Sequence, residues 1–152
     1  WSAIGQYHDL ITPLHACMIA GAIANDGVMM EPKLLYSVSS SLKTTYSVTP
    51  SAAATPVGSS AAGKLKEMMI GAVKNGTGKK AALKHYTVGG KTGTAEIADG
   101  DTNAEHAWFV GFVDDSEHPL AIAVILEKAG SGGSNAAPAA KKVLTRAIEL
   151  GY

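Results

Sequence analysis

The chain has 152 residues, and lysine plus arginine number 13, as do aspartate plus glutamate, so the formal net charge is zero. This balance argues against a nucleic-acid-binding surface or a charged tail. No apolar run approaches the ~18 residues of a transmembrane helix, and the single cysteine, Cys17, excludes an internal disulfide. The length suits one domain with a substantial core. Because the chain begins at Trp1 rather than Met, we interpret residues 1–152 as one domain-sized piece of a longer protein.

The first half of the chain predicts two helices separated by short strands. Thr12-Pro13 is typical of a helix start, and Asn25-Asp26-Gly27 of its end. Strands are expected at 28–30, 34–38 and 46–48, residues 50–58 as a loop, and a second helix at about 60–75. We expect the first helix to bury a face composed of Leu14, Cys17, Met18, Gly21 and Ala22. We expect the second to bury Leu65, Met69, Ala72 and Val73.

The second half predicts an antiparallel sheet and a final helix. Strands are expected at about 86–97, 106–113 and 119–127, joined by turns at Asp99-Gly100 and Asp114-Asp115. The last two are apolar on both faces, so both faces need a cover. A helix at about 136–149, capped by Ser134 or Asn135, can cover one of them. The predicted class is α+β, an antiparallel sheet flanked by helices.

The stretch Gly90-Lys91-Thr92-Gly93-Thr94 carries the chemistry of the chain. Strand alternation puts Lys91 and Gly93 on one face, Thr92 and Thr94 on the other. A twisted edge strand could still bring the ammonium and both hydroxyls to one anionic group. Gly93 would let a substrate backbone approach, and the Thr94 N–H could serve as an oxyanion donor. Lys-Thr-Gly is a signature of the serine acyl-transferases that react with penicillin.

Together with six further elements, this stretch resembles the class B-like penicillin-binding proteins, and the resemblance covers essentially the whole chain. The elements occur in the order Ile4-Gly5-Gln6, Thr12-Pro13-Leu14-His15, Ala22-Ile23-Ala24-Asn25-Asp26-Gly27, Asn75-Gly76-Thr77-Gly78, Gly90-Lys91-Thr92-Gly93-Thr94-Ala95-Glu96, His106-Ala107-Trp108-Phe109-Val110-Gly111-Phe112 and Gly132-Gly133 with Ala136-Ala137-Pro138.

The resemblance implies the C-terminal part of a D,D-transpeptidase domain with a partial serine β-lactamase/transpeptidase-like fold, acting outside the cytoplasm and anchored to the membrane upstream. It implies peptidoglycan stem peptides and β-lactams as ligands of the parent protein, with no cofactor. Lys91 is similar to the lysine that steers the substrate carboxylate. Thr92 and Thr94 resemble its hydroxyl ligands, and the Thr94 N–H resembles an oxyanion donor. A β-lactam sensor or a serine β-lactamase-related domain is the alternative.

The nucleophile expected of this family has no counterpart in the chain. The sequence lacks a Ser-x-Asn triplet, and its one Ser-x-x-Lys match, Ser40-Ser41-Leu42-Lys43, lies in a turn-like stretch instead of opening a helix. We therefore expect the chain alone to be inactive. In the family, the strand that matches 119–127 pairs with one from the missing half, so we expect self-association through this edge.

Several residues also have plainer interpretations. Lys91 could be a solvated edge lysine, Thr92 simply a good strand former, and Trp108 and Phe109 core residues. The carboxylates Glu96, Asp99, Asp101 and Glu105 are typical of a solvated hairpin tip. The histidines 8, 15, 85, 106 and 118 lack metal-ligand spacing, so no metal site is expected. The glycine-rich stretches 76–80 and 130–135 depart from nucleotide-binding loops, and 130–135 is interpreted as a strand-to-helix turn.

Overall fold

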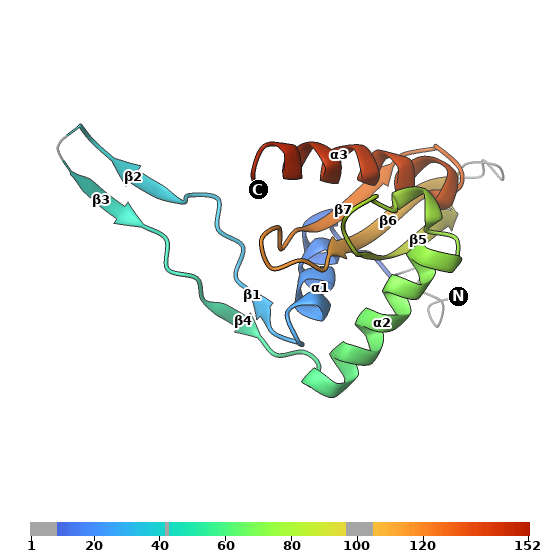
Figure 1. The fold of residues 1–152 in the computed structure, drawn as a ribbon, viewed down its shortest axis with the longest axis horizontal. Coiled ribbons are helices and arrows are strands. Elements are labelled where there is room, and N and C mark those ends of the chain that lie inside the picture. Colours follow the sequence, from blue (N-terminus) through green and yellow to red (C-terminus); the bar gives the residue numbers. More distant parts are fainter. Residues whose placement is uncertain (1–8, 42, 97–104) are drawn as a thin grey trace.

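The computed structural model describes residues 9–41, 43–96 and 105–152, and their elements confirm the predicted α+β class (Figure 1). Expectations for residues 1–8, Leu42 and the 97–104 turn, including Asp99 and Asp101, lie outside the described residues. In chain order the elements are α1 (Pro13–Ala24), β1 (Met29–Met30), β2 (Ser37–Ser39), β3 (Thr44–Ser47), β4 (Ala52–Ala54), α2 (Ser59–Asn75), the 3-10 turn η2 (Lys79–Ala81), β5 (Val88–Glu96), β6 (Glu105–Val113), β7 (Ala121–Leu126), the π turn η3 (Gly132–Ala136) and α3 (Ala137–Glu149).

Helix α1 begins and ends as predicted but buries a different face. The Thr12 hydroxyl accepts a hydrogen bond from the His15 N–H, and Asp26 and Gly27 adopt positive φ after the last turn. The side chains packed inside are Ala16, Ala20, Ala22 and Ile23. Of the predicted face, Leu14 is exposed and Cys17 half-buried, and only Ala22 is buried. The helix is apolar on nearly all sides, so periodicity could not single out one face.

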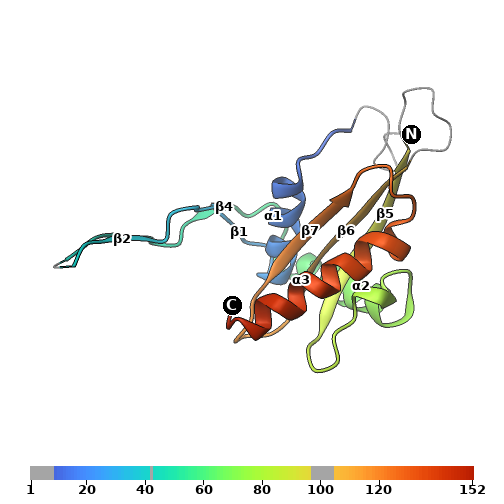
Figure 2. The ribbon, with the colours of Figure 1, turned by 90° about the horizontal axis from the view of Figure 1, so that it is seen from above.

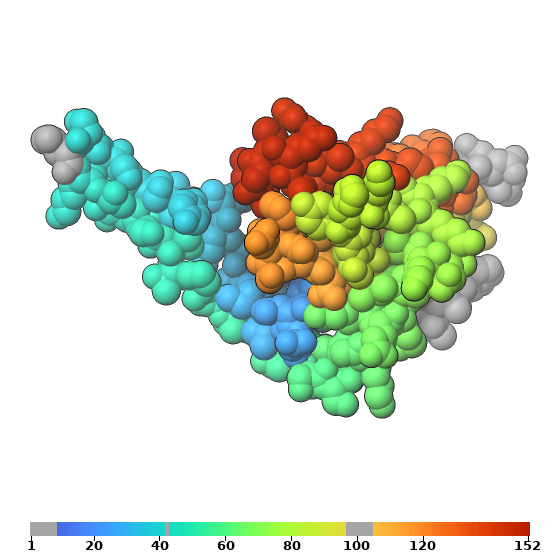
Figure 3. All heavy atoms as spheres, in the orientation of Figure 1, coloured from blue at the N-terminus to red at the C-terminus, as the bar shows by residue number. Residues whose placement is uncertain are grey.

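Between α1 and α2 the chain forms an arm, defined here as residues 31–41 and 43–51, which extends away from the body (Figures 1 and 3). Strands β2 and β3 pair antiparallel, with Val38 opposite Tyr46, and most of the arm is exposed. The prediction of a loop at 50–58 was wrong in part, because β4 pairs with β1 at the base of the arm. The two sides of the arm are therefore held together at its base by β1 and β4 and further out by β2 and β3.

The sheet has the order β5-β6-β7 with antiparallel pairing throughout, as predicted. Helix α3 covers one face, and α1 and α2 lie against the other (Figures 1 and 2). Phe109 is fully buried on the α3 face with Val88, Ile122 and Leu144. On the opposite face, Phe112 packs with α1. These two clusters form the core, one on each side of the sheet.

The flanks of the sheet show further departures from the sequence expectations. Helix α2 buries Val73, as predicted, but leaves Leu65 exposed. Helix α3 has no side-chain cap; instead, the Asn135 amide donates to the Ala129 carbonyl oxygen and closes the turn from β7. Within the described residues, no helix combines the length and apolar character needed to cross a bilayer.

Candidate active site

Strand β5 divides its side chains between the two faces of the sheet as predicted. A Cβ at Gly93 would lie 3.2 Å from the Trp108 Cβ, which places this position on the α1/α2 side. Lys91, two residues earlier, shares that side and is exposed. Thr92 and Thr94 point to the α3 side. Lys91 and Gly93 thus lie on the face of the sheet opposite α3, against which α1 and α2 pack.

The ladder between β5 and β6 determines which backbone groups reach the outer edge of β5. The Asp114 N–H donates to the Thr87 carbonyl oxygen at 2.9 Å, so residues 87 and 114 form a hydrogen-bonded pair. Such pairs alternate in an antiparallel ladder, so Thr92 and Thr94 direct their backbone N–H and C=O groups outward. Among the described residues, no strand pairs with this edge. The Thr92 carbonyl and Thr94 N–H are therefore neighbours on an open edge.

Lys91 brings a positive charge to this same edge. Its Nζ donates to the Thr92 carbonyl oxygen at 2.6 Å. The ammonium consequently lies beside the outward Thr94 N–H, because the C=O of one residue and the N–H two residues later are adjacent on a strand edge. A cation and a backbone donor at one edge form an arrangement suited to an anionic group in an extended ligand.

The two threonines differ in their surroundings. Thr94 is exposed, and its hydroxyl accepts a long hydrogen bond, 3.4 Å, from the Gly132 N–H. Thr92 is only 9% exposed, and its hydroxyl lies 2.7 Å from the Thr77 hydroxyl on the α3 side. The Thr92 hydroxyl, expected from the sequence to bind a carboxylate alongside Lys91, is therefore buried and engaged by Thr77, whereas the Thr94 hydroxyl is exposed.

The Ser40–Lys43 match lies at the tip of the arm, in a hairpin rather than a helix. The Ser40 hydroxyl donates to the Lys43 carbonyl oxygen at 3.2 Å, and the Ser40 N–H donates to the same oxygen at 2.8 Å. Ser40 thus contacts the Lys43 backbone next to the paired strands β2 and β3, through both its N–H and its hydroxyl. The geometry agrees with the interpretation that this motif is fortuitous.

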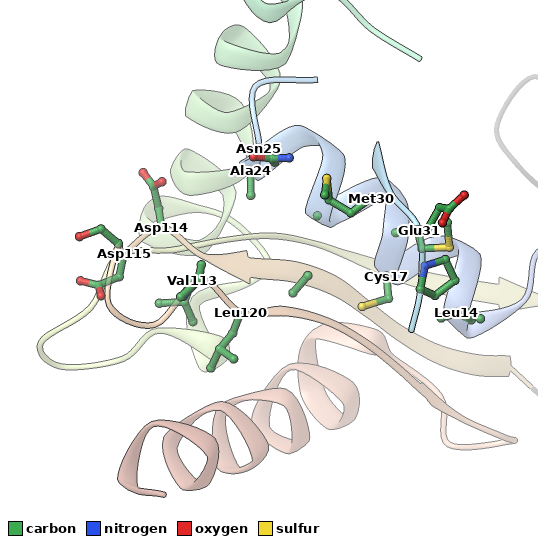
Figure 4. Close-up of a pocket in the computed structure, with 16 residues that line it drawn as sticks. Leu14, Cys17, Ala24, Asn25, Met30, Glu31, Val113, Asp114, Asp115 and Leu120 are labelled. Carbon is green, nitrogen blue, oxygen red and sulfur yellow. The ribbon is translucent and has the colours of Figure 1, made fainter. Parts of the chain in front are cut away.

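A cavity of about 770 Å³ lies elsewhere, between α1, the start of the arm and the β6–β7 turn (Figure 4). Its lining includes Leu14, Cys17 and Met18, which is much of the face predicted to be buried in the core. Burial raises the pKa of the Cys17 thiol, against a smaller lowering by the backbone N–H of Ala123. Cys17 is therefore a neutral apolar wall residue, and the cavity does not include Lys91 or Thr94.

Sequence analysis assigned no role in the site to two residues that contact β5 on its α3 side. Thr77 meets Thr92, and Gly132 lies so close to β5 that a Cβ there would be 2.2 Å from the Gly93 carbonyl oxygen. Both stand in glycine-rich stretches, and the stretch around Gly132 forms the strand-to-helix connection that the sequence predicts, with η3 between β7 and α3. The available signals were the family-like elements that contain both residues and their glycines, which indicate close backbone approach without naming the partner.

Two further clusters considered in the sequence are metal-ligating side chains and the carboxylates around the β5–β6 connection. In residues 9–41, 43–96 and 105–152, no group of three His, Cys, Asp or Glu side chains could hold a metal ion. Glu96 lies opposite Glu105 at the end of the β5–β6 ladder, and the other two carboxylates of that cluster lie outside the described residues.

Comparisons with known proteins identify relatives of the chain. The family profile described as penicillin binding protein transpeptidase domain matches residues 1–145. Peptidoglycan D,D-transpeptidase PbpA of Mycolicibacterium smegmatis is 33% identical over 99% of this chain and 32% of its own length. Peptidoglycan D,D-transpeptidase MrdA of Haemophilus influenzae is 32% identical over 93% of this chain and 24% of its own. The chain thus spans about a third or less of the length of these relatives.

A solved structure gives the same answer. Penicillin-binding protein A from M. tuberculosis, in a ceftriaxone acyl-enzyme complex, matches 97% of this chain and 34% of its own with a TM-score of 0.87 and 32% identity. The imipenem acyl-enzyme complex of that protein gives a TM-score of 0.84 at 33% identity. With a profile match over residues 1–145 and these relatives in sequence and fold, the chain belongs to the penicillin-binding protein transpeptidase family.

Proposed function

We propose that this chain forms one wall of the active site of a peptidoglycan D,D-transpeptidase, which cross-links stem peptides through a serine acyl-enzyme and is acylated by penicillins. The observation that carries the proposal is the open edge of β5, where the Lys91 ammonium rests on the Thr92 carbonyl beside the Thr94 N–H. The relatives named as D,D-transpeptidases and the acyl-enzyme complexes of a structural neighbour support it.

In this proposal the roles divide along the strand. Lys91 attracts the carboxylate at the peptide end, an interaction strengthened when the closed site excludes water. The Thr94 N–H donates to the oxyanion that develops on the attacked carbonyl, and the exposed Thr94 hydroxyl binds the carboxylate. Gly93 gives the ligand room at the face where a side chain would already crowd Trp108. Thr92 supports the strand instead of touching the ligand.

The nucleophilic serine and its activating lysine belong, by this proposal, to a part of the protein outside residues 1–152. The stem peptide and β-lactams are therefore ligands of the complete protein, which acts outside the cytoplasmic membrane and is anchored upstream of this chain. The missing half of the domain is the partner that completes the cleft. The chain alone has no catalytic activity, since an oxyanion wall without a nucleophile cannot form the acyl-enzyme.

The test compares acylation of the full-length protein and its Lys91→Ala variant by a fluorescent penicillin. Loss of the charge partner should slow acylation by ~10²-fold or more, the scale of a lost electrostatic contact in the transition state. Lys64→Ala is the matched control, because Lys64 is an exposed lysine of α2 and its removal changes the net charge equally. An unchanged rate in Lys91→Ala would remove Lys91 from the mechanism.

A second measurement addresses the missing nucleophile. Residues 1–152 incubated with penicillin should show no acyl adduct by mass spectrometry. An adduct on Ser40 would contradict the assignment of that motif to a hairpin turn. Rapid antibiotic turnover by the full-length protein would instead favour a β-lactamase, and reversible binding without acylation would favour a sensor.

A further inference from the structure

Thr77 lies behind the proposed site and connects it to the end of helix α2. Its turn is tightly fitted: a Cβ at Gly76 would be 2.8 Å from the Ala72 carbonyl oxygen, and one at Gly78 would be 3.2 Å from a Val73 methyl. Val73 is itself only 3% exposed. Because no larger side chain fits at Gly76 without displacing backbone, the turn holds Thr77 in a fixed place relative to the core.

The π turn η3, which precedes α3, also packs against Thr77. A Cβ at Gly133 would lie 2.8 Å from the Thr77 carbonyl oxygen, and Gly132 packs against the backbone of Gly93. Thr77 is thus approached along its backbone by two turns, although the residue itself is exposed. Its hydroxyl reaches the Thr92 hydroxyl at 2.7 Å.

Thr92 connects the Thr77 hydroxyl to the open edge of β5. Its side chain is engaged by Thr77 on the α3 face, and its carbonyl oxygen accepts the Lys91 Nζ at 2.6 Å on the open edge. A single residue therefore joins the Thr77 hydroxyl to the Lys91 ammonium. A rotation of the Thr92 peptide, which the side-chain contact with Thr77 opposes, would move the oxygen to which the ammonium donates.

We propose that Thr77 is a positioning residue for Lys91, acting through Thr92, although it lies on the opposite face of the sheet and touches no ligand. The inference rests on the proposed function of Lys91 and goes beyond it, since it assigns a role to a residue outside the Lys-Thr-Gly stretch. One neutral hydrogen bond is at stake, so its loss should slow acylation about two- to tenfold.

The experiment uses the full-length protein and the rate of acylation by a fluorescent penicillin. Thr77→Val keeps the shape and removes the hydroxyl, whereas Thr77→Ser keeps the hydroxyl. Thr145→Val is the matched control, because Thr145 is an exposed threonine of α3. We expect a two- to tenfold loss in Thr77→Val, a near wild-type rate in Thr77→Ser, and no change in Thr145→Val.

The decisive comparison repeats Thr77→Val in the Lys91→Ala background. If Thr77 acts by positioning Lys91, the loss disappears there, because the group that it positions is absent. Thr92→Val removes the same hydrogen bond from the strand side, and should show the same dependence on background even if Thr77→Val does not fold. Thermal melting of each variant establishes that the fold is kept.

The outcomes separate this inference from the proposed function. Wild-type rates in both Thr77→Val and Thr92→Val, with Lys91→Ala slowed, overturn the inference and leave the function standing. An equal loss in both backgrounds also overturns it, because the effect would then bypass Lys91. A wild-type rate in Lys91→Ala itself defeats the proposed function.

Discussion

Gly132 gives a sharp test of how tightly the π turn is fitted against the sheet. In Gly132→Ala the new Cβ would lie 2.2 Å from the Gly93 carbonyl oxygen and 2.3 Å from that of Trp108. Both contacts are with backbone atoms of two paired strands, so no side-chain rotation relieves them. Gly132 does not have a positive φ, so alanine meets steric crowding but no unfavourable backbone conformation.

The size of the effect follows from the displacement required. Ordinary contact begins at 3.4 Å, so relief of the 2.2 Å contact requires a shift of 3.4 − 2.2 = 1.2 Å in the turn or in β5. Overpacking of this kind costs about 1–3 kcal/mol of unfolding free energy. If the strand rather than the turn moves, the groups of β5 that we propose to act in acylation shift by about 1 Å, which can slow catalysis by about 10²-fold.

Urea unfolding of the full-length protein measures the stability, and the fluorescent penicillin measures acylation. Gly71→Ala is the matched control, since a Cβ at Gly71 in α2 meets nothing within 4 Å. That substitution should stabilise the helix by about 0.5–1 kcal/mol. The reasoning would be refuted if Gly132→Ala unfolded with a free energy equal to or above that of the wild type.

Two further predictions concern other surfaces. In β7, Ala121 directs its N–H to an edge that no strand among the described residues occupies. Residues 1–152 should therefore self-associate at ~10 μM in sedimentation, and Ala121→Pro should reduce the self-association. A sharp monomer in the wild-type chain would count against this prediction. The raised pKa of Cys17 predicts that iodoacetamide alkylation of the native protein reaches half its maximal rate at a higher pH than for the unfolded chain. Because the pKa is raised in the folded state, the contribution of this thiol to stability is complete below the pKa of the unfolded chain and is lost as pH rises through the pKa of the folded protein. An alkylation midpoint of the native protein at or below that of the unfolded chain would contradict the raised pKa.

Much of the fold could be predicted because its signals are local. The Thr12 cap, the apolar strands and the amphipathic α3 are each encoded within a dozen neighbouring residues. The β1–β4 pairing was missed, since Ala52–Ala54 has low strand propensity and its partner lies more than 20 residues earlier. The buried face of α1 was misjudged because an almost uniformly apolar helix has no distinctive side.

For the candidate site, the sequence predicted how the side chains of β5 alternate but not which residues pack against that strand. Alternation correctly separated Lys91 from Thr92 and Thr94, because it depends only on the pleat of β5. The contact between Thr77 and Thr92 spans 15 positions of sequence and depends on how a turn packs behind the sheet. No periodicity or motif carries that information, so the contact that buries the Thr92 hydroxyl is visible only in the arrangement in space.

The arm has a practical consequence for the continuity of the chain. Its tip carries Lys43, an exposed residue that trypsin can recognise, and β2 and β3 are joined there by a short turn. Cutting the backbone after Lys43 would leave the first piece attached through β1 against β4 and α1 against the sheet. The tip is accordingly a place where a fluorophore, an epitope or an inserted peptide can be attached while the strand that bears Lys91 keeps its supports.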